Sequence, residues 1–427
     1  MTRAADQRRV FELLEQDDEA SQQLLCDLVR VPSLGGSDGE IAIQHTLAQL
    51  LEAEGLETDH WQLPLESLVS ESDFPGVEVP RREAWGLVGR LRGRGGGRSL
   101  MLNAHVDVVP PGDVAAWQHD PFSGYVQQGN VYGRGACDMK GGLVSAFAAV
   151  RAIRRAGVAL KGDLLLACVV GEEDGGLGTY GLLRRGWRAD ACVVPEPTSL
   201  DLVPANAGAL TFRLRVRGRA THASRRMEGV SAVECFWPVF DALRQLERER
   251  NCDVDPLMRR WSLPYALSVG TVHSGDWASS VPDLLVAEGR LGVALDESID
   301  QARRALESAV AHASGRVAWL RDHPVEVEWW GGQFASGRLA RDSDLLERVR
   351  AAHLVAANSS QTPAVWGAPY GSDLRLLTGL GNIPTLHYGP GDAAHAHAPN
   401  EFVAWEEVTT AARTLAVVAL DVTGTDN

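Results

Sequence analysis

The feature that most constrains the fold is a change in the spacing of apolar residues near residue 208. Before this point, short and almost wholly apolar runs such as DLLLACVV (163–170) alternate with helical stretches. Such strands are buried on both faces, which is typical of a mostly parallel sheet covered by helices. After it, residues 210–217 (LTFRLRVR) alternate strictly between apolar and polar side chains, which indicates a strand with one face in water. The chain therefore has to build two different sheets.

The first kind of strand predicts an α/β domain made of two separate parts of the chain. Its apolar runs lie at residues 85–91, 99–109, 163–170 and 191–196. From about residue 332 helices return, with one more short strand in PTLHYG at 384–389. We expect residues 1–207 and 332–427 to form one α/β domain with a mostly parallel sheet.

The stretch between these parts, residues 208–331, predicts a separate and smaller domain. Its order of elements is strand, helix, two strands, helix and strand. This βαββαβ order makes a one-sided sheet covered by two helices. The simplest account is that the small domain is inserted into the large one.

Two Gly-rich stretches help to place the loops. Residues 10–56 have helical spacing interrupted at VPSLGGSDGE, which predicts two surface helices. RGRGGGRS at 92–99 has no following Gly-Lys-Ser/Thr, so we interpret it as a hairpin turn and not as a phosphate-binding loop.

Charge and composition exclude several classes of function. Lys and Arg number 41 against 56 Asp and Glu, which gives a net charge of −15 and argues against nucleic acid and anionic membranes as partners. The sequence contains no apolar run of about 18 residues and no secretory signal at its N-terminus. The six cysteines are scattered, as is typical of reduced and mostly buried thiols. We expect a cytoplasmic protein.

Acidic and imidazole side chains recur where the predicted strands end. His105 and Asp107 lie two residues apart in NAHVDVVP, so their side chains project from the same face. Asp138 lies in GRGACDMKGG, where the glycines free the backbone to present a carboxylate inward. Taken alone, each of these features is also compatible with a polar strand end or a turn.

Two successive strands continue the series. Residues 163–170 run directly into Glu172, Glu173 and Asp174, and the next strand ends close to Glu196. The carboxyl ends of strands are where open α/β sheets place their sites. Carboxylates gathered there are costly to bury unless cations compensate them.

The C-terminal part adds two histidines, His395 and His397, in GPGDAAHAHAPNE after a predicted strand. Oxygen and imidazole donors without thiolates suit two divalent metal ions, with one carboxylate bridging them. The candidate metal ligands are His105, Asp138, Glu173, Glu196 and His397.

At this point the chain resembles the dinuclear-zinc metallopeptidase and deacylase family that includes acetylornithine deacetylase, succinyl-diaminopimelate desuccinylase, aminoacylase and glutamate carboxypeptidase. Five motifs occur in the family's order between about residue 20 and residue 415. The resemblance implies a catalytic α/β domain with an inserted ferredoxin-like lid and dimerisation domain. It also implies two Zn²⁺ ions, although Co²⁺ or Mn²⁺ would accept the same donors.

The resemblance implies a role for each ligand. His105 and Glu196 would hold one metal, Glu173 and His397 the other, and Asp138 would bridge both. His395 is the weaker candidate, because only His397 stands four residues before the acid in the family-like stretch HAPNE.

The resemblance also assigns residues around the metals. Glu172 would be the general base for a metal-bridged water, and Asp107 would accept a hydrogen bond from His105 and so fix its tautomer. His222, in GRATHASRRMEG, would reach the active site of a partner subunit and donate to the oxyanion, so the active form would be a homodimer.

Substrate-binding residues are less securely marked. Many relatives carry an Asn before a Val-Pro pair in the lid, where this chain has Ser280. Arg290 resembles an arginine that some relatives use for a substrate carboxylate. Gly389 and Gly391 would let backbone amides approach the ligand. Arg375 is equally compatible with substrate binding and with a surface salt bridge.

The favoured interpretation is a metallohydrolase that removes the acyl group from an N-acyl amino acid or a similar small amine. One alternative is a dipeptidase or carboxypeptidase of the same family, because the same metals would attack any positioned amide. Another is a non-catalytic binding protein that keeps the fold. Retention of Glu172 and of all five candidate ligands argues against the second alternative.

Overall fold

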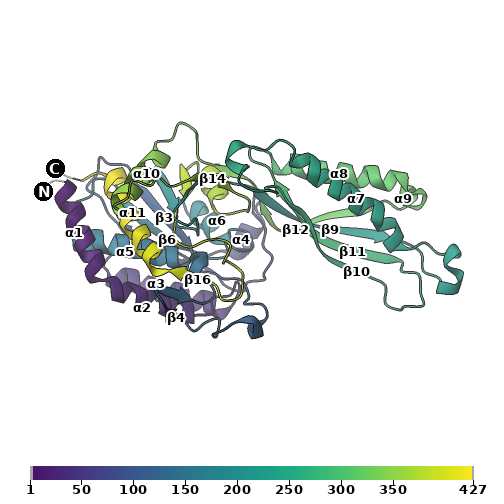
Figure 1. Ribbon diagram of the computed structural model, residues 1–427, viewed down its shortest axis with the longest axis horizontal. Coiled ribbons are helices and arrows are strands. Elements are labelled where there is room, and N and C mark those ends of the chain that lie inside the picture. Colours follow the sequence, from purple (N-terminus) through teal and green to yellow (C-terminus); the bar gives the residue numbers. More distant parts are fainter. Residues whose placement is uncertain (1–2, 426–427) are drawn as a thin grey trace. The chain divides into compact units, whose positions relative to one another are not determined.

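The computed structural model describes residues 3–425, which divide into two units (Figure 1). The larger unit comprises residues up to 205, 338–366 and 372 onward, and the smaller comprises 206–337 and 367–371. The sequence assigned 208–331 to the insertion and all of 332–427 to the larger domain, so the short return of the chain at 367–371 was not anticipated. No helix among the described residues is both long and apolar enough to span a bilayer.

The larger unit is built on a nine-stranded mixed sheet. In spatial order its strands are β1 (Glu57–Gln62), β2 (Trp85–Leu91), β6 (Leu164–Val169), β3 (Leu100–His105), β7 (Ala191–Val194), β15 (Thr385–His387), β8 (Leu202–Asn206) and β13 (Gly337–Arg338), with β14 (Val365–Ala368) paired to β8. The four central strands β6, β3, β7 and β15 are mutually parallel. Every residue of β3 and β6 is buried, as expected for strands covered on both faces.

Helices cover this sheet. They are α1 (Arg3–Gln16), α2 (Asp18–Arg30), α3 (Asp38–Ala53), α4 (Leu65–Val69), α5 (Gly141–Arg155), α6 (Leu177–Arg184), α10 (Leu345–Ala356) and α11 (Trp405–Thr423). Helices α5 and α11 pack against β3, α10 against β15, α3 against β1 and β2, and α6 against β2 and β6. A separate three-stranded sheet contains β16 (Phe402–Ala404), β5 (Asn130–Tyr132) and β4 (Tyr125–Gln127).

Two local predictions for this unit were wrong. The N-terminal region forms three helices instead of two. Residues 92–99 do not form a hairpin turn. They connect β2 to β3, and these strands are separated in the sheet by β6, which pairs with both.

The smaller unit has a four-stranded antiparallel sheet in the order β10-β11-β9-β12. Its elements are β9 (Gly208–Arg217), α7 (Ala232–Arg250), β10 (Leu267–Ser274), β11 (Leu284–Val293), α8 (Ile299–Arg316), α9 (Ala318–Asp322) and β12 (Glu326–Phe334). Ser298 begins α8 with a capping box, in which its side chain and that of Gln301 each bind the other's backbone N–H.

The alternating pattern of β9 explains how this sheet is covered. Leu210, Phe212 and Leu214 are fully buried in the core shared with the two long helices. On the opposite face, Arg213 lies between Glu288 of β11 (2.6 Å) and Glu328 of β12 (3.1 Å). The predicted fold class is confirmed: an α/β unit with a mostly parallel sheet and a separate βαββαβ unit.

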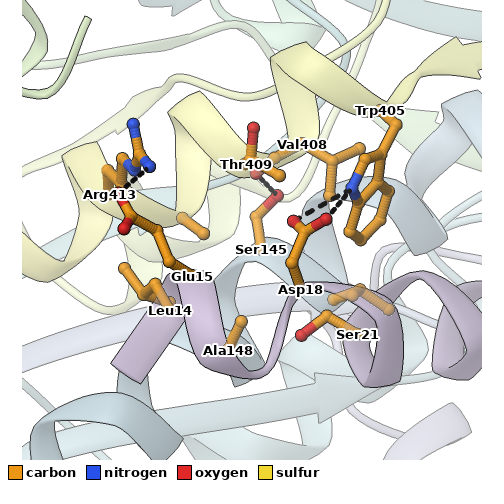
Figure 2. A pocket seen from close by; sticks show the side chains of 12 residues that line it. Leu14, Glu15, Asp18, Ser21, Ser145, Ala148, Trp405, Val408, Thr409 and Arg413 are labelled. Carbon is orange, nitrogen blue, oxygen red and sulfur yellow. Dashed lines mark hydrogen bonds and ion pairs between the residues drawn. The ribbon is translucent and has the colours of Figure 1, made fainter. Parts of the chain in front are cut away.

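A cavity of about 350 Å³ lies among α1, α2, α5 and α11 (Figure 2). Asp18 accepts the indole N–H of Trp405 at 3.1 Å at one end, and Glu15 pairs with Arg413 at 2.7 Å at the other. None of the five candidate metal ligands lines this cavity.

Candidate metal centre

The candidate ligands come together because their strands end at one edge of the central sheet. β3 ends at His105, which pairs in register with Val169 at the end of the parallel strand β6. Glu173 follows β6 by four residues, and Glu196 follows the end of β7 by two. Parallel neighbours present their carboxyl ends on the same side, which is where α/β sheets bind ligands.

Asp138 lies between the two imidazoles and offers one oxygen to each. Its Oδ1 is 3.1 Å from Nε2 of His105, and its Oδ2 is 3.5 Å from Nε2 of His397. Nε2 of His397 is also 3.1 Å from Glu173, and Nε2 of His105 is 3.9 Å from Glu196. All five predicted ligands therefore belong to one cluster, although they are spread over almost 300 residues of sequence.

Glu172 lies in the same cluster. Its carboxylate is grouped with His105 and Glu196, with one potential ligand atom of each within 4.8 Å of the others. The residue is 7% exposed, and its Oε1 is buried without a hydrogen-bond partner among the described residues. Such an orphaned oxygen is costly unless a ligand or a proton satisfies it.

Burial and mutual repulsion make these acids difficult to ionise together. The pKa of Glu172 is raised well above its usual value, chiefly by burial and secondly by the negative charge of Asp373. Burial followed by the charge of Asp138 raises the pKa of Glu196 and of Glu173 as well. Hydrogen bonds to Asp138 and Glu173 raise the pKa of His397 to about 11. The cluster therefore favours bound positive charge, either protons or cations.

The donor set fits divalent metal ions. Nδ1 of His105 lies 3.0 Å from the backbone oxygen of Asp107, which can only accept, so Nδ1 carries the proton. In the neutral form of the ring, Nε2 is unprotonated and faces carboxylate oxygens, an arrangement that a cation between them would satisfy. Imidazole and carboxylate donors without thiolate suit zinc, cobalt or manganese.

The role expected for Asp107 needs correction. Its carboxylate is 3.6 Å from Nδ1 of His105, which is too long for a hydrogen bond, and its backbone oxygen is the acceptor instead. The carboxylate accepts the backbone N–H groups of Glu172 (3.3 Å) and Glu173 (3.1 Å). Asp107 therefore fixes the His105 tautomer through its backbone oxygen, and its carboxylate holds the loop that carries Glu172, Glu173 and Asp174.

The third acid of that loop has a different function. Asp174 pairs with the buried Arg81 at 2.9 Å, and Arg81 also binds Glu40 at 2.9 Å. Asp174 further accepts the backbone N–H of Val79 at 2.9 Å. The adjacent acids are thus separated by their partners: Glu172 and Glu173 face the cluster, and Asp174 anchors the loop.

Of the two C-terminal histidines, only His397 joins the cluster. His395 is exposed, and its ring packs on Phe402 with centroids 4.5 Å apart. His397 has a positive φ of 60°, so the chain turns sharply at this residue.

The expected role of two glycine amides is not supported. The N–H of Gly389 donates to Thr198 at 3.1 Å, and that of Gly391 donates to Glu407 at 2.6 Å. A Cβ at Gly389 would lie 2.3 Å from the carbonyl oxygen of Pro195. These glycines allow close packing of the backbone behind the site, and their amides are already occupied.

Arg375 is neither a surface residue nor a partner in a surface salt bridge. It is 5% exposed and donates to the backbone oxygens of Ser372 (2.6 Å) and Gly175 (2.7 Å). Burial lowers the pKa of this guanidinium to about 10, against the opposing charges of Asp373 and Glu172. Arg375 therefore ties the loop that carries Glu172 to the loop that carries Asp373.

The remaining predicted residues lie in the smaller unit. His222 and Ser280 occupy neighbouring segments joined by an antiparallel bridge, and both are exposed. Nδ1 of His222 accepts the backbone N–H of Ser224 (3.2 Å) and lies 2.8 Å from its hydroxyl. An N–H group can only donate, so the neutral ring carries its proton on Nε2. Arg290 is exposed on β11, with its guanidinium 5.7 Å from the ring of Phe334.

Sequence reasoning missed several buried residues that support the cluster. Glu401 accepts the backbone N–H of Asp138 at 3.1 Å, and Asp373 accepts the hydroxyl of Thr179. Glu401 ends the stretch HAPNE and was noticed only as a marker for His397. Asp373 offered no comparable signal, because a lone acid in GSDLR is typical of a turn.

Two imidazoles and several carboxylates at the carboxyl edge of an α/β sheet form a donor set of the kind that metal-dependent hydrolases use. The family described as Peptidase family M20/M25/M40 matches residues 101–421, so the chain belongs to this family. The resemblance predicted from the motifs is confirmed, and the protein is an M20 family metallohydrolase that acts on amide bonds.

Relatives similar in sequence along most of the chain have names of deacylating enzymes. An N-formyl-4-amino-5-aminomethyl-2-methylpyrimidine deformylase from Bacillus subtilis is 26% identical, over 94% of this chain and 93% of the relative. An acetylornithine deacetylase from Edwardsiella ictaluri is 27% identical, over 88% and 91%.

Solved structures match the fold. A di-peptidase from Saccharomyces cerevisiae has a TM-score of 0.75 at 14% identity, with 99% of each chain covered. An M20 family metallo-carboxypeptidase from Sulfolobus solfataricus has a TM-score of 0.73 at 15% identity, with 93% and 98% covered. At these identities the likeness concerns the fold alone.

Proposed function

We propose that the protein removes the acyl group from an N-acylated amino acid or a similar small amine, using two divalent metal ions. The observation that carries this proposal is the position of Asp138, with one oxygen toward each imidazole, beside the buried and unpartnered Oε1 of Glu172. The names of the relatives that match most of the chain favour deacylation over peptide cleavage.

Each ligand has a distinct part in holding the metals. His105 and Glu196 would hold one ion, and Glu173 and His397 the other, with Asp138 shared between them. When bound, two divalent ions supply Lewis-acid chemistry that activates water near neutral pH and polarises the amide carbonyl. Zinc is the favoured identity, and cobalt or manganese fits the same donors.

Glu172 would act as general base and then as general acid. Its carboxylate takes a proton from the attacking water and returns it to the departing amine. Burial and neighbouring negative charge raise its pKa, which suits a group that has to hold a proton during the reaction. Arg375 and Asp107 position it by binding the backbone of its own loop.

His222 would donate to the oxyanion of the tetrahedral intermediate. The contact from Ser224 leaves the ring proton on Nε2, so the neutral imidazole is already a donor. Ser280, joined to the His222 segment by backbone pairing, would contact the substrate alongside it. Arg290 would bind a substrate carboxylate where one is present.

We further propose that the active form is a homodimer assembled through the smaller unit. Its edge strand β10 is mostly exposed, and Trp277 and Met227 are 72% and 87% exposed in nearby loops of the same unit. Large exposed apolar side chains and an unpaired strand edge are typical of surfaces that bind a partner. His222 would then act in the partner's site.

A panel of substrates tests the reaction. Metal-loaded protein is assayed against N-formyl, N-acetyl and N-succinyl amino acids, the corresponding amines without a carboxylate, and dipeptides. Hydrolysis of the acylated amines with little cleavage of dipeptides is expected. Turnover of dipeptides alone would replace the proposal by a dipeptidase, and no turnover with two bound metals would indicate a binding protein.

Complementation tests the dimer. Glu172→Gln and His222→Ala variants are co-expressed with different tags, and mixed dimers are purified. If His222 acts in the partner's site, each mixed dimer contains one intact site and has about half of wild-type activity. If His222 acts within its own chain, both sites of the mixed dimer are defective and activity stays at the level of the single variants.

A further inference from the structure

We propose that Glu401 is the positioning residue for Asp138, the bridging ligand, and that Arg134 holds Glu401 in place for this purpose. The inference rests on the proposed metal centre and goes beyond it. In this inference, the orientation of the bridging carboxylate depends on a second carboxylate that does not bind metal itself.

The contacts of Glu401 are concentrated on the segment that carries Asp138. Its Oε1 accepts the backbone N–H groups of Cys137 (3.0 Å) and Asp138 (3.1 Å). Its backbone oxygen accepts the N–H of Gly133 at 2.9 Å. The residue is 1% exposed, so water cannot replace these hydrogen bonds.

Arg134 fixes the other carboxylate oxygen. Its guanidinium forms a buried ion pair with Glu401 Oε2, and it also donates to the backbone oxygen of Pro110 at 3.4 Å. The guanidinium lies 5.3 Å from the ring centre of Trp117. Arg134 is itself 1% exposed, so water does not compete for the ion pair.

The larger unit contains a second contact of the same form. The carboxylate of Asp107 accepts the N–H groups of Glu172 and Glu173, and that of Glu401 accepts those of Cys137 and Asp138. In both cases a buried carboxylate binds two consecutive amides, and the second amide belongs to a candidate metal ligand. The repetition indicates that these contacts serve the ligands and are not only local packing.

Asp138 needs this support more than the other ligands do. A bridging carboxylate has to present both oxygens in fixed directions, so a small rotation of its backbone affects both metals at once. Because Glu401 lies four residues after His397, the same residue also couples the Asp138 segment to the segment of a second ligand. Loss of the contact should therefore weaken metal binding more than it weakens the fold.

The first variant is Glu401→Gln, which keeps the shape and removes the charge. The amide would turn its oxygen toward Arg134 and its NH₂ group toward the two backbone N–H groups, which breaks the contact with Asp138. The metal-free protein is titrated with Zn²⁺ alone and with Mn²⁺ alone against a competing chelator. We expect affinity to fall about 10- to 100-fold, the usual effect of losing a residue that orients a ligand.

Two further variants separate positioning from general stability. Glu407→Gln is the matched control, because Glu407 accepts a single loop amide, that of Gly391, which does not belong to a ligand. In the double variant Arg134→Gln, Glu401→Gln, no guanidinium remains to hold the oxygen of the amide at 401, which is then free to accept the two backbone N–H groups. We expect the double variant to bind metal more tightly than Glu401→Gln. Thermal unfolding of each metal-free variant is measured in parallel.

The outcomes are distinct. Weaker metal binding in Glu401→Gln, at least partial recovery in the double variant and near wild-type binding in Glu407→Gln would support the inference. Wild-type affinity for two ions in Glu401→Gln would overturn it, and so would affinities that simply follow the melting temperatures. If the wild-type protein binds two ions but hydrolyses no N-acyl amine, the proposed function fails and the positioning role can still be tested.

Discussion

The proposed metal ligands of the larger unit and the proposed substrate-binding residues of the smaller unit differ in how firmly the protein holds them. His105, Glu196 and the backbone of Asp138 are buried or anchored by buried hydrogen bonds, whereas the side chain of His397 is 51% exposed and is held by its contacts with Asp138 and Glu173. His222, Ser280 and Arg290 are all exposed. The first group gathers at the edge of a rigid parallel sheet, and the second lies on loops and on the outer face of a small sheet.

This difference follows from the chemistry that each group has to perform. Bound cations demand fixed donor positions, and buried acids are tolerated only where every partner is in place. Contacts with a substrate tolerate adjustment, so they can lie on mobile and variable surface segments.

The strongest test of this contrast is Asp138→Asn, which removes the charge of the bridging ligand. We expect the loss of at least one bound ion and a fall of activity to background, because Asp138 offers one oxygen to each imidazole and the amide would replace one of these oxygens by an NH₂ group. Metal content by mass spectrometry and hydrolysis of an N-acyl substrate measure both effects. Retention of two tightly bound ions would remove Asp138 from the bridging position.

Glu172→Gln should have the next largest effect and a different signature. The amide keeps the volume but cannot take a proton, so kcat should fall about 10²- to 10⁴-fold. Metal content should remain at the wild-type level, because the five proposed ligands are intact. Full activity in this variant would show that another group moves the proton.

The same contrast explains how far the sequence could predict this protein. Apolar runs located the central strands closely: 85–91 for β2 and 163–170 for β6 (Leu164–Val169). Strands buried on both faces leave few alternative interpretations. The segment at 92–99 was misassigned because strand order depends on long-range pairing, which a local turn signal does not contain.

For the site, the sequence indicated the residues that bind but not those that hold them. Acids and histidines at strand ends are visible as a pattern, whereas the role of Glu401 depends on a contact with a segment more than 260 residues away. The amides of Gly389 and Gly391 were misinterpreted for a similar reason. A glycine shows that the backbone comes close to something, but not whether that neighbour is a ligand or another part of the protein.

In the smaller unit, His222→Ala should lower kcat about 10²- to 10³-fold, the usual value of one oxyanion donor. Because the side chain is exposed, the free energy of unfolding should change by no more than about 0.5 kcal/mol. His312→Ala, an exposed histidine of α8 in the same unit, is the control and should leave kcat unchanged. A change confined to KM would indicate that His222 binds substrate without stabilising the transition state.

Ser224→Ala should have the smallest effect, and it tests how the exposed residues of the smaller unit are held in place. The variant keeps the backbone N–H that donates to Nδ1 of His222 and loses only the hydroxyl contact of 2.8 Å. One neutral hydrogen bond contributes about 1 kcal/mol, so kcat should fall about fivefold. The ¹⁵N spectrum of the imidazole should still show the proton on Nε2, and Ser224→Thr should restore kcat. If Ser224→Ala matched His222→Ala in activity, the hydroxyl and not the main chain would fix the ring. The position of His222 would then depend on a side-chain contact as strictly as the proposed metal ligands do.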